Sequence, residues 1–430
     1  MTQRVWITGI GVISPIGTGR DAFWAGVHAA RSAVRRIDRF DPSPFRSQVA
    51  AQIDDFEPLD HMEAKTARQL DRFSQFALAA GRLALADAGL EGNPDGSANG
   101  GPDRDRIGVY LGSALGGIAY AERQHERFME RGIRSVAPHL ALAVFGGAAP
   151  ANLGIALDLR GPILSTANSC ASGAVALGEA LHAIRHGVVD AVVAGGAEVP
   201  LSPLAFGAFD IIRALSSGSN DTPDRAARPF DAGRDGFVMG EGVALLVLEA
   251  ADVARRRGAR PYAELMGYGS TSDAHHMVQP RADGREAARA ISIALDDAGV
   301  SPSEIDYVNA HASSTPLGDI AEARAIARAL DGRARAVPVS GTKALYGHPL
   351  GASSALEAAI CSLAIRDGWA PGTANLETMD PEVVEQLPGL LRDGRPGRYE
   401  RVLSTSFGFG GLNAALVFGA PPEATQSIVK

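Results

Sequence analysis

The sequence predicts an α/β protein assembled from two similar halves, and two observations carry this prediction. Short, continuously apolar runs such as 107–111 and 191–194 alternate with helix-patterned segments. This alternation is typical of parallel strands in a sheet that is covered on both faces. Residues 171–187 (ASGAVALGEALHAIRHG) also match residues 352–368 (ASSALEAAICSLAIRDG) without a gap. Both segments start with small residues and reach I-R-x-G at the same distance, which indicates a duplicated α/β unit.

The two matching segments predict equivalent helices that meet near the centre of the molecule. Cys170 directly precedes the first copy, and Gly351 takes the corresponding place before the second. Cys361 lies inside the second copy at an apolar helical position, so we expect it to be a core residue. We divide the chain into an N-terminal half, 1–253, and a C-terminal half, 254–430.

The first half is expected to open with a short strand at 5–7 and a glycine-rich turn (GIGVISPIGTG). These glycines do not fit a nucleotide fingerprint, because there is neither G-x-G-x-x-G nor a following Lys-Ser/Thr. The remaining elements follow from apolar periodicity and from Gly/Pro punctuation. They are helices near 21–30 and 67–88, a Gly/Pro/Asp-rich loop at 91–105, the strand 107–111, a charged helix within 119–135, a buried apolar stretch at 138–158, a strand at 163–164, the helix from 171, the strand 191–194, a long loop at 213–236 and an apolar strand within 236–250.

The second half repeats the same order of patterns. The expected elements are a helix at 284–298, a strand at 305–309, a helix at 319–330, a short strand at 337–340, a helix at 352–366 and a final strand pair around 406–418.

Composition excludes several classes of function. Hydrophobic residues make up 46% of the 430 residues and charged residues 21%, as in ordinary globular proteins. The net charge of −8, without a dense Lys/Arg block, argues against nucleic-acid binding. Two cysteines exclude a disulfide framework and a multi-cysteine zinc site, and they suit a reducing cytosol. No apolar run approaches the roughly 18 residues of a membrane span, so we expect a cytoplasmic protein without a membrane partner.

Cys170 has the position of a nucleophile. An apolar β-leaning run ends just before it, and a helical pattern begins at Ala171 and stops at Gly187. A thiol at a helix N-terminus meets unpaired backbone N–H groups and the positive end of the helix dipole. Both favour the thiolate, so we expect a lowered pKa for Cys170.

The second half supplies residues that could converge on this thiol. His311 lies just past an apolar strand, and His348 lies in a glycine-punctuated turn five residues after Lys343. The glycines of 406–413 (SFGFGGLN) would let backbone amides approach a ligand closely, as an oxyanion hole requires. A lone activated cysteine could serve a protease, a hydrolase or an acyltransferase. The two histidines, Lys343 and the glycine-rich segment narrow the choice among these three enzyme classes.

The motifs around these residues resemble the elongating β-ketoacyl-acyl-carrier-protein synthases of the thiolase superfamily, over essentially the whole chain. The motifs, in the family's order, are VWITGIGVISPIG at the N-terminus, GPxxSxxxxCxSG around Cys170, DAVVAGGAE (190–198), RPFDAGRDGFVMGEG (228–242), SDAHHMVQP (272–280), YVNAHASSTPLGD (307–319), GTKALYGHPLGA (341–352) and SFGFGGLNAALVF (406–418). The resemblance implies a thiolase-like fold, with two duplicated α/β halves in a five-layered α-β-α-β-α core.

The resemblance also implies roles for single residues. Cys170 matches the nucleophile that accepts an acyl chain from a carrier-protein thioester. His311 and His348 match the pair that assists decarboxylation of a malonyl thioester and stabilises the enolate. The backbone N–H groups of Cys170 and Phe409 match the oxyanion hole. Lys343 matches the family's lysine beside the histidines, and we expect Glu322 to be its ion-pair partner.

Further matches concern the acyl chain. Phe409 corresponds to an aromatic gate, and Gly408 and Gly410 give its loop the freedom to move. Leu115 corresponds to a residue that lines the acyl tunnel, and Leu140 belongs to a pair, His139-Leu140, where the family commonly has Phe-Phe. Other departures from the family are Asn168-Ser169, Ala312-Ser313 and Leu412. They suggest a specialised synthase for a polyketide or an unusual acyl chain.

The predicted activity is therefore a decarboxylative Claisen condensation between an acyl thioester and malonyl-acyl-carrier protein, in fatty acid or polyketide elongation. An alternative is the catalytic subunit of a heterodimeric type II polyketide ketosynthase, with a chain-length-factor partner that lacks the cysteine. A non-catalytic subunit, a degradative thiolase and a serine hydrolase fit poorly, because Cys170 is present, Cys361 matches no motif and G-x-S-x-G is absent.

The predicted partners are acyl-carrier proteins loaded with acyl and malonyl groups, and a second subunit in a homodimer or a heterodimer. No redox cofactor and no metal is implied. An acidic carrier protein needs a local basic patch on this acidic chain. The candidates are Arg68, Arg72, Arg134 and Arg213.

Overall fold

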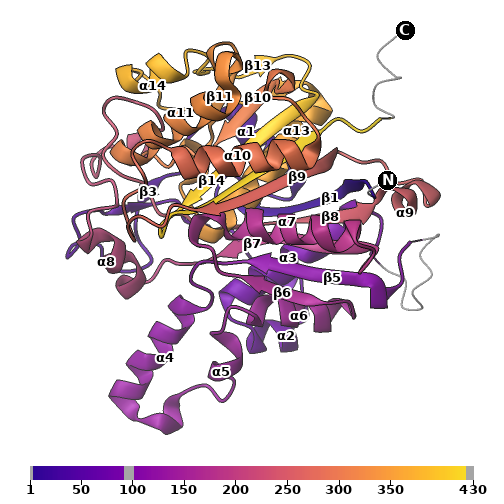
Figure 1. The fold of residues 1–430 in the computed structure, drawn as a ribbon. Coiled ribbons are helices and arrows are strands. Elements are labelled where there is room, and N and C mark those ends of the chain that lie inside the picture. Colours follow the sequence, from indigo (N-terminus) through magenta and orange to yellow (C-terminus); the bar gives the residue numbers. More distant parts are fainter. Residues whose placement is uncertain (1–2, 92–100, 423–430) are drawn as a thin grey trace.

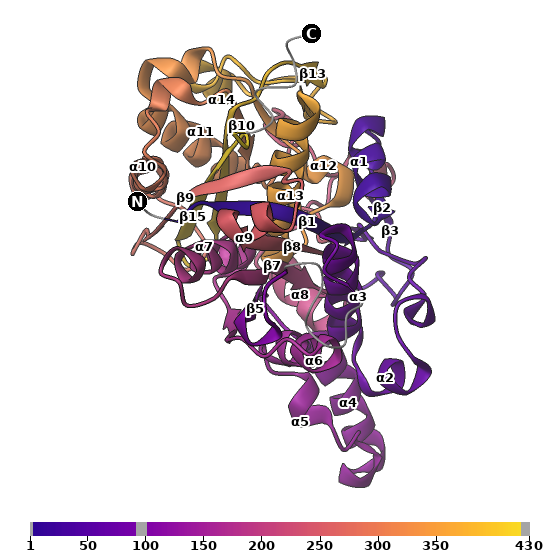
Figure 2. The same ribbon diagram turned by 90° about the vertical axis from the view of Figure 1, so that its right-hand side faces the viewer.

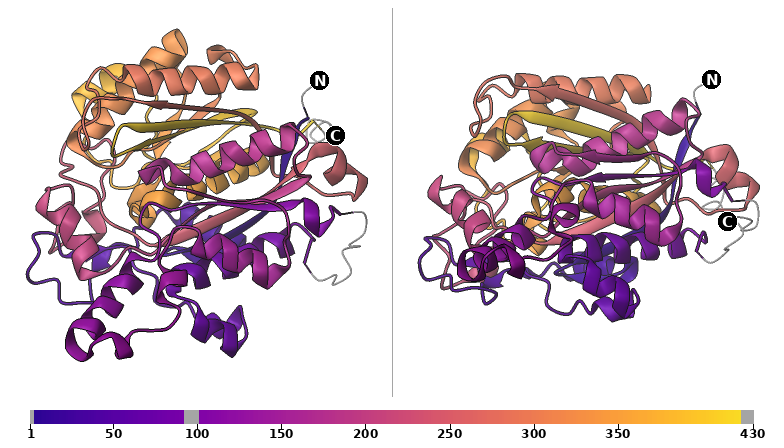
Figure 3. Two further views of the ribbon diagram at one scale, coloured as in Figure 1. Left: turned by 60° about the horizontal axis from the view of Figure 1, so that its bottom comes forward. Right: turned by 90° about the horizontal axis from the view of Figure 1, so that it is seen from below.

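The computed structural model describes residues 3–91 and 101–422. Most of the loop predicted at 91–105 lies outside these residues. The chain forms five layers of helices and strands, as predicted (Figure 1; Figure 2 shows them from the side). Two outer helix layers, with α3 and α6 on one side and α10 and α11 on the other, enclose two groups of strands. The helices α7 and α13 lie between the strand groups, and Figure 3 shows the same layering from below.

The strands of the first half lie in the order β6-β5-β7-β8-β1. Their bounds are β1 (Val5–Ser14), β5 (Ile107–Gly112), β6 (Ile163–Thr166), β7 (Ala191–Glu198) and β8 (Gly242–Ala250). The short strand β2 (Gly17–Thr18) pairs with β1, and β3 (Arg35–Arg36) and β4 (Val49–Ala50) form a separate antiparallel pair. The pairs β5–β6 and β5–β7 are parallel, whereas β7–β8 and β1–β8 are antiparallel. The predicted parallel sheet is therefore mixed.

The second half repeats this arrangement in the order β11-β10-β14-β15-β9, with the same two parallel and two antiparallel pairings. The bounds are β9 (Ala263–Ser272), β10 (Tyr307–Ala310), β11 (Val339–Gly341), β14 (Arg401–Gly408) and β15 (Leu412–Gly419), with a separate pair β12 (Trp369–Ala370) and β13 (Arg395–Pro396). A short antiparallel contact between β1 and β9 joins the halves. The predicted duplication is confirmed by this identical strand order.

The duplication extends to single glycines. An added Cβ at Gly9 of β1 would lie 2.2 Å from the carbonyl oxygen of Ala84 in α3, and one at Gly267 of β9 would lie 2.2 Å from that of Ala294 in α10. Each helix therefore packs on its strand at a distance that only glycine permits. The prediction of a short strand at 5–7 followed by a turn was wrong, because Gly9 and Gly11 belong to a strand that continues to Ser14.

The longer helices largely lie where they were predicted, whereas the helices at Pro203–Ile211 and Pro381–Gln386 were not predicted. The bounds are α1 (Arg20–Ala29), α2 (Ala64–Gln69), α3 (Arg72–Asp87), α4 (Ile118–Arg131), α5 (Leu140–Ala143), α6 (Ala148–Leu157), α7 (Ser172–Arg185), α8 (Pro203–Ile211), α9 (Ala251–Arg256), α10 (Arg285–Ala298), α11 (Pro316–Leu330), α12 (Lys343–Tyr346), α13 (Ser353–Asp367) and α14 (Pro381–Gln386). The single helix predicted at 67–88 is two, because the Asp71 side chain caps a new helix through the N–H of Ser74.

The segment 138–158 was predicted to be buried, and this is wrong for part of it. Leu142 is 68% exposed and Ile155 is 80% exposed. The helices α4 and α5 form an arm that projects from the body of the molecule (Figures 1 and 2). Apolar side chains on such an arm resemble core residues in sequence, because an apolar residue does not itself show whether it is buried.

The two central helices, α7 and α13, meet as predicted. Ala174 N–H donates to Ser354 Oγ at 2.8 Å, and an added Cβ at Gly173 would lie 3.1 Å from Ala355 Cβ. A 3₁₀ turn precedes each helix, and both turns begin with a residue at positive φ, Ser169 at 49° and Leu350 at 37°. The turn that contains Cys170 and its duplicate thus share a strained backbone. Within the described ranges, no helix is long and apolar enough to cross a membrane.

Candidate active site

Cys170 lies at the corner between β6 and α7, in the 3₁₀ turn Ser169–Ala171, and only 5% of its surface is exposed. The loop after β14 closes over it. An added Cβ at Gly408 would lie 3.0 Å from the backbone nitrogen of Cys170, so this loop approaches the nucleophile as closely as its backbone allows. The backbone N–H groups of Phe409 and of Cys170 itself interact with the sulfur. The thiol therefore faces the pair of amides that were predicted to form an oxyanion hole.

His348 contacts this thiol directly. Its Nε2 lies 3.1 Å from Cys170 Sγ, and its Nδ1 lies 2.6 Å from the hydroxyl of Ser353 at the start of α13. The ring of Phe237 packs edge-on against the imidazole, with ring centres 5.2 Å apart. The residues Ser353 and Phe237 were not found from the sequence, because nothing local marks a serine or a phenylalanine as a neighbour of a distant histidine.

His311 follows β10 and approaches from the other half. Its ring centre is 5.2 Å from that of His348, at an angle of 79°. Its backbone N–H donates to Glu322 at 2.8 Å and to Thr405 at 3.1 Å, and Thr405 in turn donates to Glu322 at 2.6 Å. These bonds fix the end of the strand, so the imidazole is held in place by its own backbone.

The predicted ion pair between Lys343 and Glu322 is wrong. Lys343 pairs with Glu357 of α13, and its ammonium also donates to the carbonyl oxygen of His311 and, at 3.3 Å, to His311 Nδ1. Glu322 instead accepts the N–H groups of His311 and Ala312. Both glutamates are buried, and helix α13 rather than α11 presents its carboxylate to the lysine.

The protonation of the site differs from the prediction. Burial raises the pKa of Cys170 to about 12, although the ammonium of Lys343 and the amides of Phe409 and Cys170 act in the opposite direction. The expected lowering of the thiol pKa at the helix N-terminus was wrong, because desolvation outweighs it. Burial, together with Lys343, holds the pKa of both His311 and His348 well below the usual range. The resting site therefore has a neutral thiol beside neutral imidazoles, and Cys170 needs a base to become a nucleophile.

The ligand atoms of Cys170, His311 and His348 lie within 4.8 Å of one another, a spacing that could also hold a metal ion. The hydrogen bonds around His311 argue against that use. An ammonium can only donate, so Lys343 places the lone pair of His311 on Nδ1 and the hydrogen on Nε2. Nε2 of His311 is then a donor, which suits a developing negative charge and not a metal.

A cavity of about 320 Å³ reaches the three side chains. Its lining is mostly apolar, and its polar groups include two hydroxyls (Ser313 and Thr315), two guanidinium groups (Arg213 and Arg281) and three carboxylates (Asp235, Asp273 and Glu322). Asp273 ties the inner loops of this cavity together, because it accepts a hydrogen bond from the Asn413 side chain at 2.8 Å. Ser313, Thr315 and Arg281 were not among the predicted site residues. A volume of this size lies within the range of about 300–1,000 Å³ that is typical of small-molecule sites.

The other predicted residues are distributed as follows. The Phe409 ring is stacked on Phe209 with ring centres 6.1 Å apart, and the loop that was predicted to act as a gate has positive φ at Gly410 (84°). Leu115 packs against the apolar cluster that contains Cys170. Leu140 lies on the projecting arm, outside the cavity lining and outside the clusters formed by the described residues. Of these two predicted pocket residues, the fold of a single chain therefore brings Leu115, but not Leu140, close to Cys170.

The fold and the site together define a condensing enzyme of the thiolase fold, in which a buried cysteine and two histidines come from opposite halves. Comparison with known families agrees with this class. Residues 2–254 match the N-terminal domain of beta-ketoacyl synthases, and residues 262–377 match their C-terminal domain. The chain belongs to the beta-ketoacyl synthase family, and it is an enzyme of the acyltransferase type.

The relatives include 3-oxoacyl-[acyl-carrier-protein] synthases and a putative polyketide beta-ketoacyl synthase. The chain is 40% identical to 3-oxoacyl-[acyl-carrier-protein] synthase 2 of Coxiella burnetii, over 96% of this chain and 98% of the relative. It is 42% identical to a putative polyketide beta-ketoacyl synthase 1 of Streptomyces cyaneus, over 98% and 99%. Among solved structures, a beta-ketoacyl synthase from Burkholderia phymatum STM815 has a TM-score of 0.88 and 38% identity, over 97% and 100%. The ishigamide ketosynthase/chain length factor also has a TM-score of 0.88, with 34% identity over 98% and 100%.

Replacing Lys343 with methionine is expected to move the acid limb of the pH profile of activity to higher pH. The ammonium contributes to the low pKa of His311 and His348, so its removal raises both values and leaves more inactive imidazolium near pH 6. The measurement is kcat/KM between about pH 5 and pH 8. Lys65→Met, an exposed lysine on α2, is the matched control, and an acid limb that coincides with the control would contradict the assignment.

Proposed function

We propose that this protein is a 3-oxoacyl-acyl-carrier-protein synthase, which elongates a fatty acid or polyketide chain by decarboxylative condensation. The observation that carries this proposal is the buried contact between Cys170 and His348, with His311 aimed at the same point as a donor. The geometry supplies one nucleophile, one base and one fixed donor, which is the set that the two successive half-reactions require.

In the first half-reaction, the acyl group moves to the cysteine. His348 Nε2 takes the proton of the Cys170 thiol, and the sulfur attacks the thioester carbonyl of the acyl-carrier protein. The N–H groups of Cys170 and Phe409 stabilise the oxyanion of the tetrahedral intermediate. The carbon–sulfur bond to the carrier then breaks, and His348 returns the proton to the departing carrier thiol.

In the second half-reaction, malonyl-carrier protein enters the cavity and loses carbon dioxide. The electron pair of the broken carbon–carbon bond forms an enolate, whose oxygen accepts hydrogen bonds from His311 and His348. The enolate carbon attacks the acyl carbonyl on Cys170, and the cysteine sulfur leaves. One proton, taken up from solvent, restores the thiol, and the product is a 3-oxoacyl-carrier protein two carbons longer.

Acyl-carrier protein is the proposed partner in both half-reactions. Arg213 is exposed and lines the cavity, so it can meet an acidic carrier at the entrance. Arg68 and Arg134 are also exposed, whereas Arg72 is half-buried and donates to the carbonyl of Ile53. Arg213 is therefore the strongest candidate for the docking surface.

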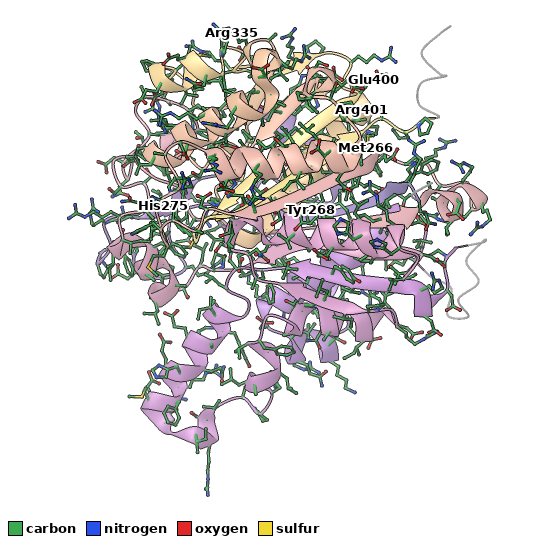
Figure 4. All side chains as sticks on the ribbon, in the orientation of Figure 1. Met266, Tyr268, His275, Arg335, Glu400 and Arg401 are labelled. Atoms are coloured by element: carbon green, nitrogen blue, oxygen red, sulfur yellow. The ribbon has the colours of Figure 1, made fainter. Side chains whose placement is uncertain are left out.

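Arg213→Glu is expected to raise the KM for acyl-carrier protein about tenfold, with a smaller effect at high salt. A small acyl thioester should react as before, because the chemistry at Cys170 is unchanged. The control is Arg335→Glu, since Arg335 lies at the far end of the C-terminal half from His275, whose loop borders the cavity (Figure 4). Equal KM values for the two variants would contradict docking at Arg213.

We propose that the chain works as a dimer through the edge of its sheet. Strand β6 is the terminal strand of the N-terminal half, and Ile163 on it is 45% exposed. An unpaired apolar edge of this kind favours association with a second chain. The partner is a second copy in a homodimer. The alternative is a homologue without the cysteine, a pairing of the kind that the ishigamide ketosynthase/chain length factor represents.

The proposed function is tested by incubating the purified protein with a panel of acyl-carrier proteins and then with malonyl-carrier protein. We expect release of carbon dioxide and a carrier-bound product two carbons longer, and the best substrate in the panel gives the chain preference. Acylation of the enzyme without elongation would favour the heterodimer. Failure of every donor to acylate the enzyme would contradict the proposed function.

A further inference from the structure

An acyl chain bound to Cys170 needs a place away from the entrance cavity. The sulfur is buried, and in the second half-reaction the cavity of about 320 Å³ must admit the malonyl thioester. The acyl chain is apolar, so the hydrophobic effect directs it into the apolar cluster that contains Cys170. Leu115, in the loop after β5, packs against this cluster without being part of the cavity lining.

One buried carboxylate holds the loop that carries Leu115. Glu198 is the last residue of β7 and is fully buried. Its Oε1 accepts the hydroxyl of Ser113 at 2.9 Å and the backbone N–H of Leu115 at 3.1 Å. Its Oε2 accepts the backbone N–H groups of Ala114 at 2.6 Å and Gly351 at 3.0 Å. The loop after β5 and the turn before α13 are thus fixed to a single side chain.

These four hydrogen bonds require the ionised form of Glu198. Each oxygen accepts two donors, and three of the four donors are backbone N–H groups, which cannot accept a proton from a carboxylic acid. The hydroxyl of Ser113 is also fully used, because its oxygen accepts the N–H of Gly116 at 2.9 Å while its hydrogen goes to Glu198. Burial raises the pKa of Glu198 to about 7, and the four hydrogen bonds act against this rise.

The second half contains a counterpart of this arrangement. Glu198 and Gly408 are the last residues of β7 and β14, two strands of 8 residues at the same place in their halves. Gly351 and Cys170 likewise have the same place in the turns before α13 and α7. After Gly408 the chain presents the N–H of Phe409 to the Cys170 sulfur, whereas Glu198 places its own carboxylate on the N–H of Gly351. The first half thus holds a closed counterpart of the proposed oxyanion hole, filled by an internal anion.

We propose that Glu198 is a positioning residue for the acyl-chain preference, because its carboxylate fixes the backbone of Leu115 and thereby keeps this side chain in place as a wall of the acyl pocket. The inference rests on the proposed function and deepens it. Glu198 takes no part in the chemistry at the sulfur. Its action through Leu115 predicts an effect that depends on the length of the acyl chain.

Glu198→Gln keeps the size of the side chain and replaces one oxygen by an NH₂ group. The remaining oxygen can still accept from Ala114 and Gly351, but the NH₂ group cannot accept the N–H of Leu115. We expect acylation of Cys170 by a twelve-carbon acyl thioester of N-acetylcysteamine to slow by about tenfold. Acylation by the acetyl thioester should slow less than about threefold, because a longer chain packs against more of the wall. The ratio of the two rates does not depend on the pKa of the thiol, which affects both alike.

Two further variants separate this effect from a general loss of structure. Glu249→Gln changes a fully buried glutamate that pairs with Arg257 and lies opposite Ala191, at the other end of β7, and it should leave the ratio unchanged. Leu115→Ala alone should slow twelve-carbon acylation, and adding Glu198→Gln to it should slow this step no further. An unchanged ratio in Glu198→Gln, or additive effects in the double variant, would overturn the inference.

Glu198→Ala gives a second measurement of the same contact. It leaves the backbone N–H groups of Ala114, Leu115 and Gly351 without an anion, and formate can supply the missing carboxylate. We expect formate to raise the rate of twelve-carbon acylation of this variant at least about threefold over chloride at the same concentration. Equal rates in the two salts would overturn the inference.

These acylation assays use neither a carrier protein nor a malonyl thioester. If the ratio changes as expected and malonyl-carrier protein gives no elongated product, the proposed function fails while the role of Glu198 stands. If elongation proceeds and the ratio does not change, the inference fails alone. Failure of the unaltered protein to accept either acyl group would contradict both.

Discussion

Cys170→Ala is expected to abolish condensation, with a loss of at least about 10³-fold. The sulfur is the atom that carries the acyl group between the two half-reactions, and no other nucleophile of the described chain lies within hydrogen-bond distance of His348 Nε2. The measurement is the formation of elongated carrier-bound product.

Cys361→Ala is the matched control for this variant. It removes the other cysteine, which is fully buried inside α13, and it should keep activity near that of the unaltered protein. Full activity of Cys170→Ala, or equal losses in both variants, would contradict the assignment of the nucleophile.

His311→Ala is expected to slow decarboxylation by about 10²–10³-fold, because it removes the fixed Nε2–H donor from the enolate oxygen. Acylation of Cys170 should fall far less, since His348 remains beside the thiol. The two half-reactions are measured separately, by the mass of the acylated enzyme and by carbon dioxide release.

His182→Ala serves as the control for the loss of an imidazole. His182 lies on α7, the helix that starts beside the nucleophile, and its ring packs near Tyr268 at 5.6 Å, away from the cavity. If His311→Ala slowed acylation as strongly as decarboxylation, the division of roles between the two histidines would be contradicted.

The fold was largely predictable because its main features are local. Apolar runs marked the buried strands, and the match between 171–187 and 352–368 indicated a duplication that the strand order now confirms. The errors arose where packing between distant segments decides the outcome. Gly9 was assigned to a turn because glycine commonly marks turns, whereas it lies in a strand pressed against Ala84. Leu142 was assigned to the core, although it lies exposed on an arm.

The residues that form the site were predictable from the sequence, whereas their ion pairs and pKa values were less so. Cys170 and the two histidines were found from their positions at strand ends and turns and from the family resemblance. The partner of Lys343 was missed because Glu357 reaches it only through the packing of α13. The pKa of Cys170 was predicted in the wrong direction because the helix terminus can be read from sequence, whereas complete burial cannot.

The most direct test of this account is to identify which residue carries the acyl group. The protein is mixed briefly with acyl-carrier protein, digested, and analysed by peptide mass spectrometry. We expect the acyl mass on the peptide that contains Cys170 and its loss when malonyl-carrier protein is added. An acyl group on the Cys361 peptide, or one on Cys170 that malonyl-carrier protein leaves in place even with a cysteine-lacking partner subunit present, would contradict the mechanism.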